Sequence, residues 1–72
     1  MPNVNHINKI LSLGEVKSLT TLSTSSIYRM MKSGDFPKQV KLSIQSVGWL
    51  ASEVHSWIDA RIAERDDLST AA

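Results

Sequence analysis

The sequence predicts an α+β domain that is mainly α-helical, with three helices and one two-stranded β-hairpin. Two short stretches with helical spacing and local capping signals lie close together in the first half of the chain, and a longer one lies in the second half. Between them the apolar residues alternate with polar ones, which is typical of β-strands. The 72 residues suffice for one such domain but not for a buried catalytic cavity of ordinary size.

The chain is expected to begin with a flexible arm, because residues 1–9 show no apolar periodicity. The first helix should start after Ser12. Ser12 and Glu15 have the spacing of a capping box, in which each side chain accepts a hydrogen bond from the other residue's backbone N–H. Apolar residues then recur at helical spacing, at Leu13, Val16 and Leu19. Residues 20–22 interrupt this pattern, so a short turn is predicted there.

A second helix is predicted within residues 22–32. The Ser23 hydroxyl can accept from the free N–H groups of a first turn, and Gly34 is suited to the left-handed residue that ends a helix. At about 100° per residue, one face carries Ile27, Met30 and Met31. The opposite face carries Ser25, Tyr28, Arg29 and Lys32. The first face is expected to pack on the core, and the second to remain exposed.

The exposed face of this second helix is suited to DNA. No acidic residue occurs from Ser23 to Ser33, so the helix does not repel phosphate. Hydroxyls near its N-terminus, where free N–H groups favour an anion, are followed by aromatic and cationic side chains. A solvated helix that merely lacks Glu and Asp is the alternative that this segment alone leaves open. The predicted DNA contacts of the helix are Thr24, Ser25, Ser26, Tyr28, Arg29 and Lys32.

A β-hairpin is predicted after a turn cluster at residues 33–37. Its strands are residues 39–42 and 47–49, joined by residues 43–46. Because a hairpin alone is not stable in water, its apolar side chains Val40, Leu42, Val47 and Trp49 should cover the helices. The loop then projects as a wing. Lys38 and Lys41 are predicted to contact phosphate, and Ser43 and Gln45 to approach the minor groove or the DNA backbone.

The third helix is expected to run from Ala51 to about Arg65. Its apolar stripe follows helical spacing through Val54, Trp57, Ile58, Arg61 and Ile62. Trp57 is predicted to be a core residue, and the helix to be structural, without base contacts. Residues 66–72 are predicted to form a disordered tail, which leaves residues 10–65 as the folded domain.

Composition and charge narrow the classes of function. Residues 1–50 carry six Lys and Arg against two acidic residues, a net charge of +4, whereas residues 51–72 carry two against five, a net charge of −3. The basic half therefore contains the predicted DNA-contacting helix. Without cysteine there is no disulfide and no thiolate metal site, and no cofactor is expected. With no apolar run of membrane-spanning length and no signal-peptide pattern, a cytoplasmic protein without a membrane partner is predicted.

Catalysis is not expected. The candidates for acid–base chemistry are His6 in the arm and His55 on the last helix, and no spacing brings either close to a nucleophile. His55 and Asp59 are four positions apart, which more often gives a surface pair than a site. Two separated histidines without cysteine also make a zinc site improbable. We therefore predict neither an enzyme nor a small-molecule substrate.

The order helix, turn, helix, hairpin, helix is that of a winged helix-turn-helix. The chain resembles the AlpA-like prophage regulators, which are related in fold to phage excisionases and to the DNA-binding domains of MerR-type regulators. The resemblance covers about residues 10–65 and rests on an ordered set of motifs: Leu13 with Glu15-Val16, Leu22-Ser23, Ser25, Ile27-Tyr28-Arg29, Met31-Lys32, Gly34, Phe36-Pro37-Lys38, Val40-Lys41-Leu42, Val47-Gly48-Trp49, Ser52-Glu53-Val54, Trp57-Ile58 and Arg61.

The resemblance implies a sequence-specific DNA-binding transcriptional regulator of prophage or mobile-element genes. Double-stranded DNA would be the partner, with the second helix in the major groove and the wing on the adjacent backbone or minor groove. An excisionase that bends DNA for an integrase is the alternative, and a winged-helix protein-interaction module is a more remote one.

The chain departs from the family pattern at three places. It carries Thr21 where the family usually has Gly, Thr24 where a basic residue is common, and Ser43-Ile44-Gln45-Ser46 where the wing tip is commonly rich in Gly and Arg. Fewer cations imply fewer phosphate or minor-groove contacts and a lower affinity for one molecule. Cooperative self-association on DNA is therefore also expected.

Overall fold

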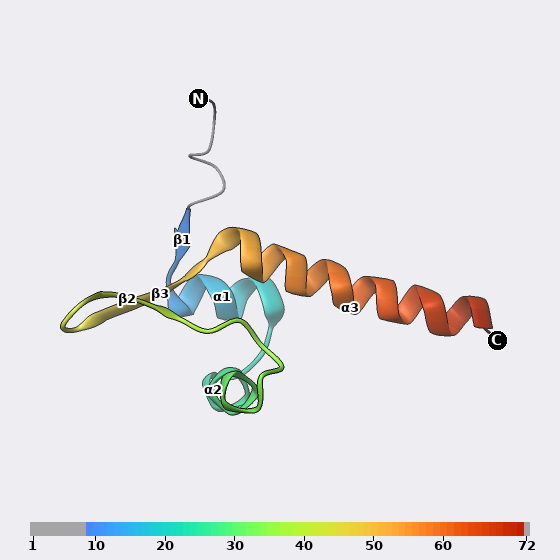
Figure 1. Cartoon of the computed structure of the whole chain (residues 1–72), viewed down its shortest axis with the longest axis horizontal. Coiled ribbons are helices and arrows are strands. Elements are labelled where there is room, and N and C mark those ends of the chain that lie inside the picture. Colours follow the sequence, from blue (N-terminus) through green and yellow to red (C-terminus); the bar gives the residue numbers. More distant parts are fainter. Residues whose placement is uncertain (1–8, 72) are drawn as a thin grey trace, which may run out of the picture.

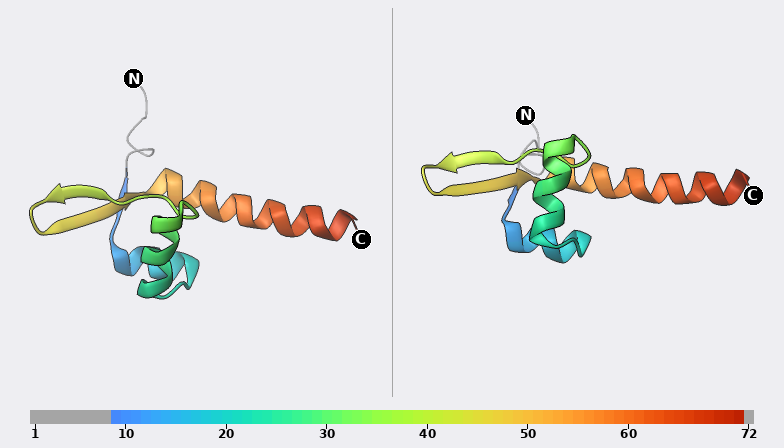
Figure 2. Two further views of the ribbon diagram at one scale, coloured as in Figure 1. Left: turned by 60° about the horizontal axis from the view of Figure 1, so that its bottom comes forward. Right: turned by 90° about the horizontal axis from the view of Figure 1, so that it is seen from below.

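The computed structural model describes residues 9–71, with the side chains described through residue 67, and has the predicted α+β architecture (Figure 1). Its elements are β1 (Ile10–Leu11), α1 (Leu13–Thr20), α2 (Thr24–Ser33), β2 (Val40–Ser43), β3 (Ser46–Leu50) and α3 (Ala51–Ala71). The β2–β3 hairpin projects from one end of the molecule and α3 extends from the opposite end, while α1 and α2 lie between them (Figures 1 and 2). The arm predicted for residues 1–9 lies almost wholly outside the described residues.

Local side-chain contacts set the ends of α1 and α2, as predicted. The Ser12 backbone N–H donates to Glu15 Oε1 at 2.8 Å, and the Glu15 N–H donates to Ser12 Oγ at 3.1 Å, which completes the capping box. At α2, the Ser26 N–H donates to Ser23 Oγ at 3.1 Å. Gly34 ends α2 with a left-handed φ of 86°.

Two threonines form the turn between α1 and α2. Thr20 Oγ1 donates to the Val16 carbonyl oxygen at 2.8 Å and accepts from the Leu22 N–H at 3.2 Å. Thr21 follows with φ of 60° and ψ of 13°, a left-handed conformation that is unfavourable for a β-branched residue. The turn thus has the geometry that glycine adopts most readily, but it is occupied by threonine.

The sheet has three antiparallel strands in the order β1-β3-β2, one strand more than predicted. Ile10 pairs with Leu50 and Leu11 with Trp49. Two residues are too few to show an alternating pattern, so β1 could not be predicted from the sequence. Gly48 permits the close approach of β1, because a Cβ there would lie 2.3 Å from Ile10 Cγ2 and 3.0 Å from the Leu11 carbonyl oxygen.

The core lies where the helices meet the base of the hairpin. Its buried apolar side chains are Leu11, Val16, Ile27, Phe36, Trp49, Ala51 and Val54. Trp49 is fully buried and lies edge-on to Tyr28 of α2, with ring centroids 6.3 Å apart. Among the predicted hairpin residues, Leu42 and Val47 are 51% and 36% exposed, so the prediction that they cover the helices is wrong. The hairpin extends past the helices, and only its base reaches the core (Figure 2).

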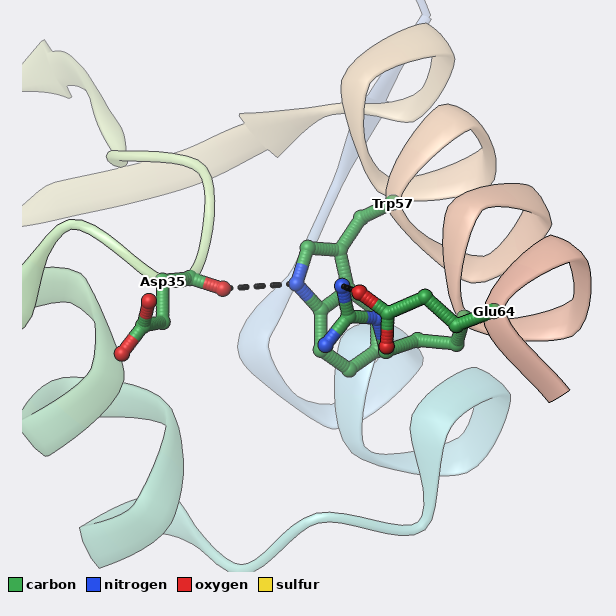
Figure 3. Close-up of polar contacts among 4 residues, drawn as sticks. Asp35, Trp57 and Glu64 are labelled. Atoms are coloured by element: carbon green, nitrogen blue, oxygen red, sulfur yellow. Dashed lines mark hydrogen bonds and ion pairs between the residues drawn. The ribbon is translucent and has the colours of Figure 1, made fainter. Parts of the chain in front are cut away.

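Trp57 lies at the edge of the core rather than inside it. It is partly buried, and its ring lies edge-on to Phe36 with centroids 4.9 Å apart. Its indole N–H donates to the backbone oxygen of Asp35 at 2.6 Å (Figure 3). The Arg61 guanidinium carbon lies 5.4 Å from the Trp57 ring centroid. Trp57 therefore fixes the segment that connects α2 to the hairpin.

The third helix is longer than predicted. Its helical backbone continues to Ala71, six residues beyond the expected end at Arg65 and into the segment predicted as a disordered tail. The side chains of residues 59–67 are exposed, and they include the ion pairs Arg61–Glu64 at 2.7 Å and Arg65–Asp66 at 3.0 Å. The Arg61–Glu64 pair, three residues apart, favours the helix slightly, and the apolar pattern alone does not predict a helical segment whose side chains are exposed.

Candidate nucleic-acid interface

The two faces of α2 are separated as the sequence predicted. Ile27 is fully buried, and Met30 and Met31 pack partly against the core. Ser25, Tyr28, Arg29 and Lys32 are exposed on the other side. The helix is therefore held by one apolar face and offers a polar, acid-free face to the surroundings.

Hydroxyl groups from the first turn of α2 position Arg29. Ser26 Oγ accepts from Ser23 Oγ at 3.0 Å and, over a longer 3.5 Å, from Nη2 of Arg29. Ser26 is half-buried, as is Thr24, whereas Ser25 is exposed. Of the three predicted contacts in this turn, Ser25 is thus the most accessible, and Ser26 is placed to orient the arginine.

Tyr28 connects α2 to the base of the wing. The residue is 41% exposed, and its ring packs edge-on against the buried Trp49 of β3, at an interplanar angle of 72°. This contact fixes the position and orientation of α2 relative to the hairpin. A partner that lies along the exposed face of α2 would therefore meet the wing at a set distance and direction.

An open groove brings together predicted contact residues from two segments. It is lined by Tyr28, Met31 and Lys32 of α2 and by Lys38 and Gln39, which precede β2. Two lysines from different segments, six residues apart, thus share one groove beside the tyrosine, an arrangement suited to a phosphate group. The sequence interpretation missed Gln39, because a single glutamine before a strand carries no pattern.

The strand register places Lys41 on the α2 side of the sheet. Lys41 pairs with Val47 across the hairpin, and paired residues project from the same face. Val47 lies two residues before Trp49 on β3 and so shares its face, which is the face that packs on Tyr28. Ser43 and Gln45 are exposed at the far end of the hairpin.

Charge is polarised along the molecule. Neither α2 nor the segment from Phe36 to Ser52 contains a carboxylate side chain. Asp35, between them, accepts from the Ser33 hydroxyl at 2.9 Å. The acidic residues of the second half lie on α3, which extends away from the wing (Figure 1); Glu53, in its first turn, is the one nearest in sequence to β3.

The histidine and acidic side chains of the described residues form no metal site. His55 is exposed and lines an open hollow together with Lys9, Glu15 and Ser18. Within the described part of the chain, no three His, Asp or Glu residues gather in a group that could hold a metal ion. No helix in residues 9–71 combines the length and apolar character needed to cross a bilayer.

Comparison with known proteins links this geometry to a family. Residues 9–62 match the family described as Prophage CP4-57 regulatory protein (AlpA). The chain belongs to the AlpA family. It is also 42% identical over 65 residues to the uncharacterized protein ORF88 of Enterobacteria phage P4, a match that spans 90% of this chain and 73% of the phage protein. The AlpA match runs from the start of β1 into α3 and includes every predicted contact residue, which confirms the resemblance found in the sequence.

Proposed function

We propose that this AlpA-family chain is a sequence-specific DNA-binding regulator of transcription from prophage or mobile-element genes. In this proposal α2 enters the major groove and the wing lies on the adjacent backbone or minor groove. The protein acts in the cytoplasm as a binding protein, without catalysis, cofactor or small-molecule substrate. Copies bound side by side on DNA cooperate.

The exposed face of α2 carries this proposal. It offers Ser25, Arg29 and Lys32 from a helix that is anchored by the fully buried Ile27 and has no acidic side chain. A guanidinium at the centre of such a face is long enough to donate to O6 and N7 of guanine. Its contact with Ser26 Oγ reduces its freedom before binding.

The groove and the wing support the same orientation. Lys32 and Lys38 line one groove next to α2, and Lys41 projects from the face of the sheet that packs on α2. Three cations are thus available to phosphates that flank a major groove occupied by α2. Contacts of this kind position a protein on DNA, whereas base contacts from α2 give the sequence preference.

An excisionase is the second candidate, because the AlpA match is to a prophage protein and an excisionase needs the same helix and wing. A protein-interaction module is the third, with the acidic residues of α3 as its docking surface. The third candidate differs from the first two in predicting no affinity for DNA.

Selection from a random pool of duplexes tests the proposal. The wild-type protein should enrich one short consensus, and a promoter that contains it should change its output when the protein is expressed. The matched variant is Ser25→Ala, which removes an exposed hydroxyl from α2 without touching the core. It should relax the consensus at one position. Failure to retain any duplex at low salt would overturn the proposal and favour the interaction module.

A further inference from the structure

The outer half of the wing carries three exposed apolar side chains among polar ones. Leu42, Ile44 and Val47 are 51%, 91% and 36% exposed, and Ile44 stands in the two-residue turn that joins β2 to β3. Hairpin turns usually carry Gly, Asn or Asp, because these residues tolerate positive φ and because Asn and Asp side chains bond to the nearby backbone. An isoleucine in this position contributes nothing to the fold, so a role in contact with a partner is the simplest explanation.

These three side chains do not form one flat face. Val47 projects on the α2 side of the sheet with Lys41. Leu42 lies on the other side, because its Cδ1 is 3.4 Å from the Cβ that Gly48 would carry if substituted. The apolar surface therefore covers both sides of a narrow ribbon and its tip. A protein partner docks on a contiguous face, whereas a ribbon that is apolar on both sides fits between two walls.

The charge of the wing and the distance of its tip from α2 indicate that the two walls are those of a DNA minor groove. The segment from Phe36 to Ser52 carries two lysines and no carboxylate, which suits a polyanion. Ile44 lies five residues before Trp49, so it extends about 15 Å from the contact of Trp49 with Tyr28 on α2. Half a helical turn of B-DNA, about 17 Å, separates a major groove from the next minor groove. With α2 in the major groove, the tip reaches that minor groove.

The geometry points to Ile44 as an apolar wedge that enters the minor groove and kinks the duplex. An aliphatic side chain cannot bond to the polar edges of the bases, so its favourable position is between two base pairs, where it replaces part of their stacking. Such insertion opens the step and bends DNA toward the major groove by about 20–90°. This inference rests on the proposed DNA-binding function and adds to it a DNA-bending activity.

The wedge also accounts for the neutral sequence of the tip. Ser43 and Gln45 flank Ile44 and can bond to sugar and base oxygens at the groove floor, while Lys41 reaches the phosphates. Apolar insertion thus supplies binding energy at a site that lacks arginine. Steps that unstack easily, such as TA, should be preferred beneath the tip.

Fluorescence energy transfer across a bound duplex tests this inference. The probe is a duplex of about 30 base pairs, enriched by the wild-type protein from a random pool and labelled with a donor and an acceptor at its ends. Wild-type protein should raise the transfer efficiency, since a bend brings the ends together. Ile44→Ser should abolish most of that rise and weaken binding about tenfold, whereas Ile44→Leu should retain both.

Two controls keep the test specific. Ile62→Ser removes a similarly apolar side chain, 44% exposed, from α3 and should leave both affinity and bending unchanged. The melting temperature of Ile44→Ser should equal that of the wild type, because the side chain makes almost no contact with the fold.

The possible outcomes separate the two proposals. Wild-type binding without a rise in transfer, or the same rise with Ile44→Ser, would overturn the wedge and leave DNA binding intact. A lower sedimenting mass of Ile44→Ser with an unchanged bend would overturn it too, and would make the wing a self-association surface. Failure of the wild type to enrich or bind any duplex would overturn both the wedge and the proposed function.

Discussion

The helix α2 and the wing form the two parts of the proposed interface, and they are built in different ways. Contacts within a few residues determine where α2 begins and ends, at Ser23 and Gly34, and its apolar face packs on the core through the buried Ile27. The wing depends on contacts from distant parts of the chain, at β1 and Trp49, and its outer half extends past the helices with exposed side chains. The comparison teaches that nearby residues determine the bounds of α2, whereas the stability of the wing depends on the distant contacts at its base.

Trp57→Ala should have the largest effect, because this residue fixes the connection between α2 and the wing. The variant loses the packing on Phe36 and the hydrogen bond to the Asp35 carbonyl oxygen. Since the indole is only partly buried, the free energy of unfolding should fall by about 3 kcal/mol, at the low end for a buried tryptophan. Thermal unfolding measures this loss of stability, and Ile62→Ala on the same helix is the control. An unchanged melting temperature would show that Trp57 does not hold the connection.

Gly48→Ala tests the base of the wing itself. The added Cβ would lie 2.3 Å from Ile10 Cγ2, so β1 must move away from β3, at a cost of about 2 kcal/mol. Gly14→Ala is the matched control. A Cβ at Gly14 has Ser12 Oγ at 3.9 Å as its nearest neighbour, and alanine favours the helix, so this variant should be as stable as the wild type or slightly more so. Equal melting temperatures for the two variants would contradict the close packing of β1 on β3.

Arg29→Ala tests the α2 side of the comparison. If the guanidinium reads a guanine, the variant should lose about 2 kcal/mol of affinity for a selected duplex and relax specificity at one base pair. Lysine should not restore the loss, because it lacks the paired donors of arginine. Equal losses on selected and random duplexes, measured by titration, would reassign Arg29 to a phosphate contact and leave the fold and DNA binding intact.

Thr21→Gly should give a smaller effect of opposite sign. Thr21 has a left-handed backbone with φ of 60°, where the Cβ of any residue other than glycine lies too close to the backbone carbonyl oxygen. Because glycine has no Cβ, the substitution should raise the free energy of unfolding by about 1 kcal/mol. Thr20→Gly, one residue earlier, should destabilise, because the Thr20 hydroxyl bonds to Val16 and Leu22. A less stable Thr21→Gly protein would show that the left-handed turn is not strained.

Features that depend on nearby residues could be predicted from the sequence, whereas features that depend on distant residues could not. The helix boundaries at Ser12, Ser23 and Gly34 and the split of α2 into a buried and an exposed face are written in nearby residues, and these predictions are confirmed. The sequence also indicated the hairpin and its place in the chain. The binding roles of the predicted contact residues, by contrast, stay predictions.

Long-range features escaped the sequence interpretation. Alternation predicted buried Leu42 and Val47, but it does not reveal how far a strand extends past the helices that could cover it. Helical spacing placed Trp57 in the core, whereas the fully buried indole belongs to Trp49, at the junction of α2, β1 and β3. The pairing of β1 depends on residues almost forty positions apart, which no local pattern records.

The salt dependence of binding to random duplex DNA tests the central claim most directly, since α2 and the wing are proposed to face phosphate. Lys32, Lys38 and Lys41 would neutralise about three phosphates, so the logarithm of affinity should fall with the logarithm of salt with a slope of about −3. Affinity should then drop about 40-fold between about 50 and 200 mM salt, and Lys41→Ala should make the slope shallower by about one unit. A flat salt dependence, or no binding at the lower concentration, would contradict the account.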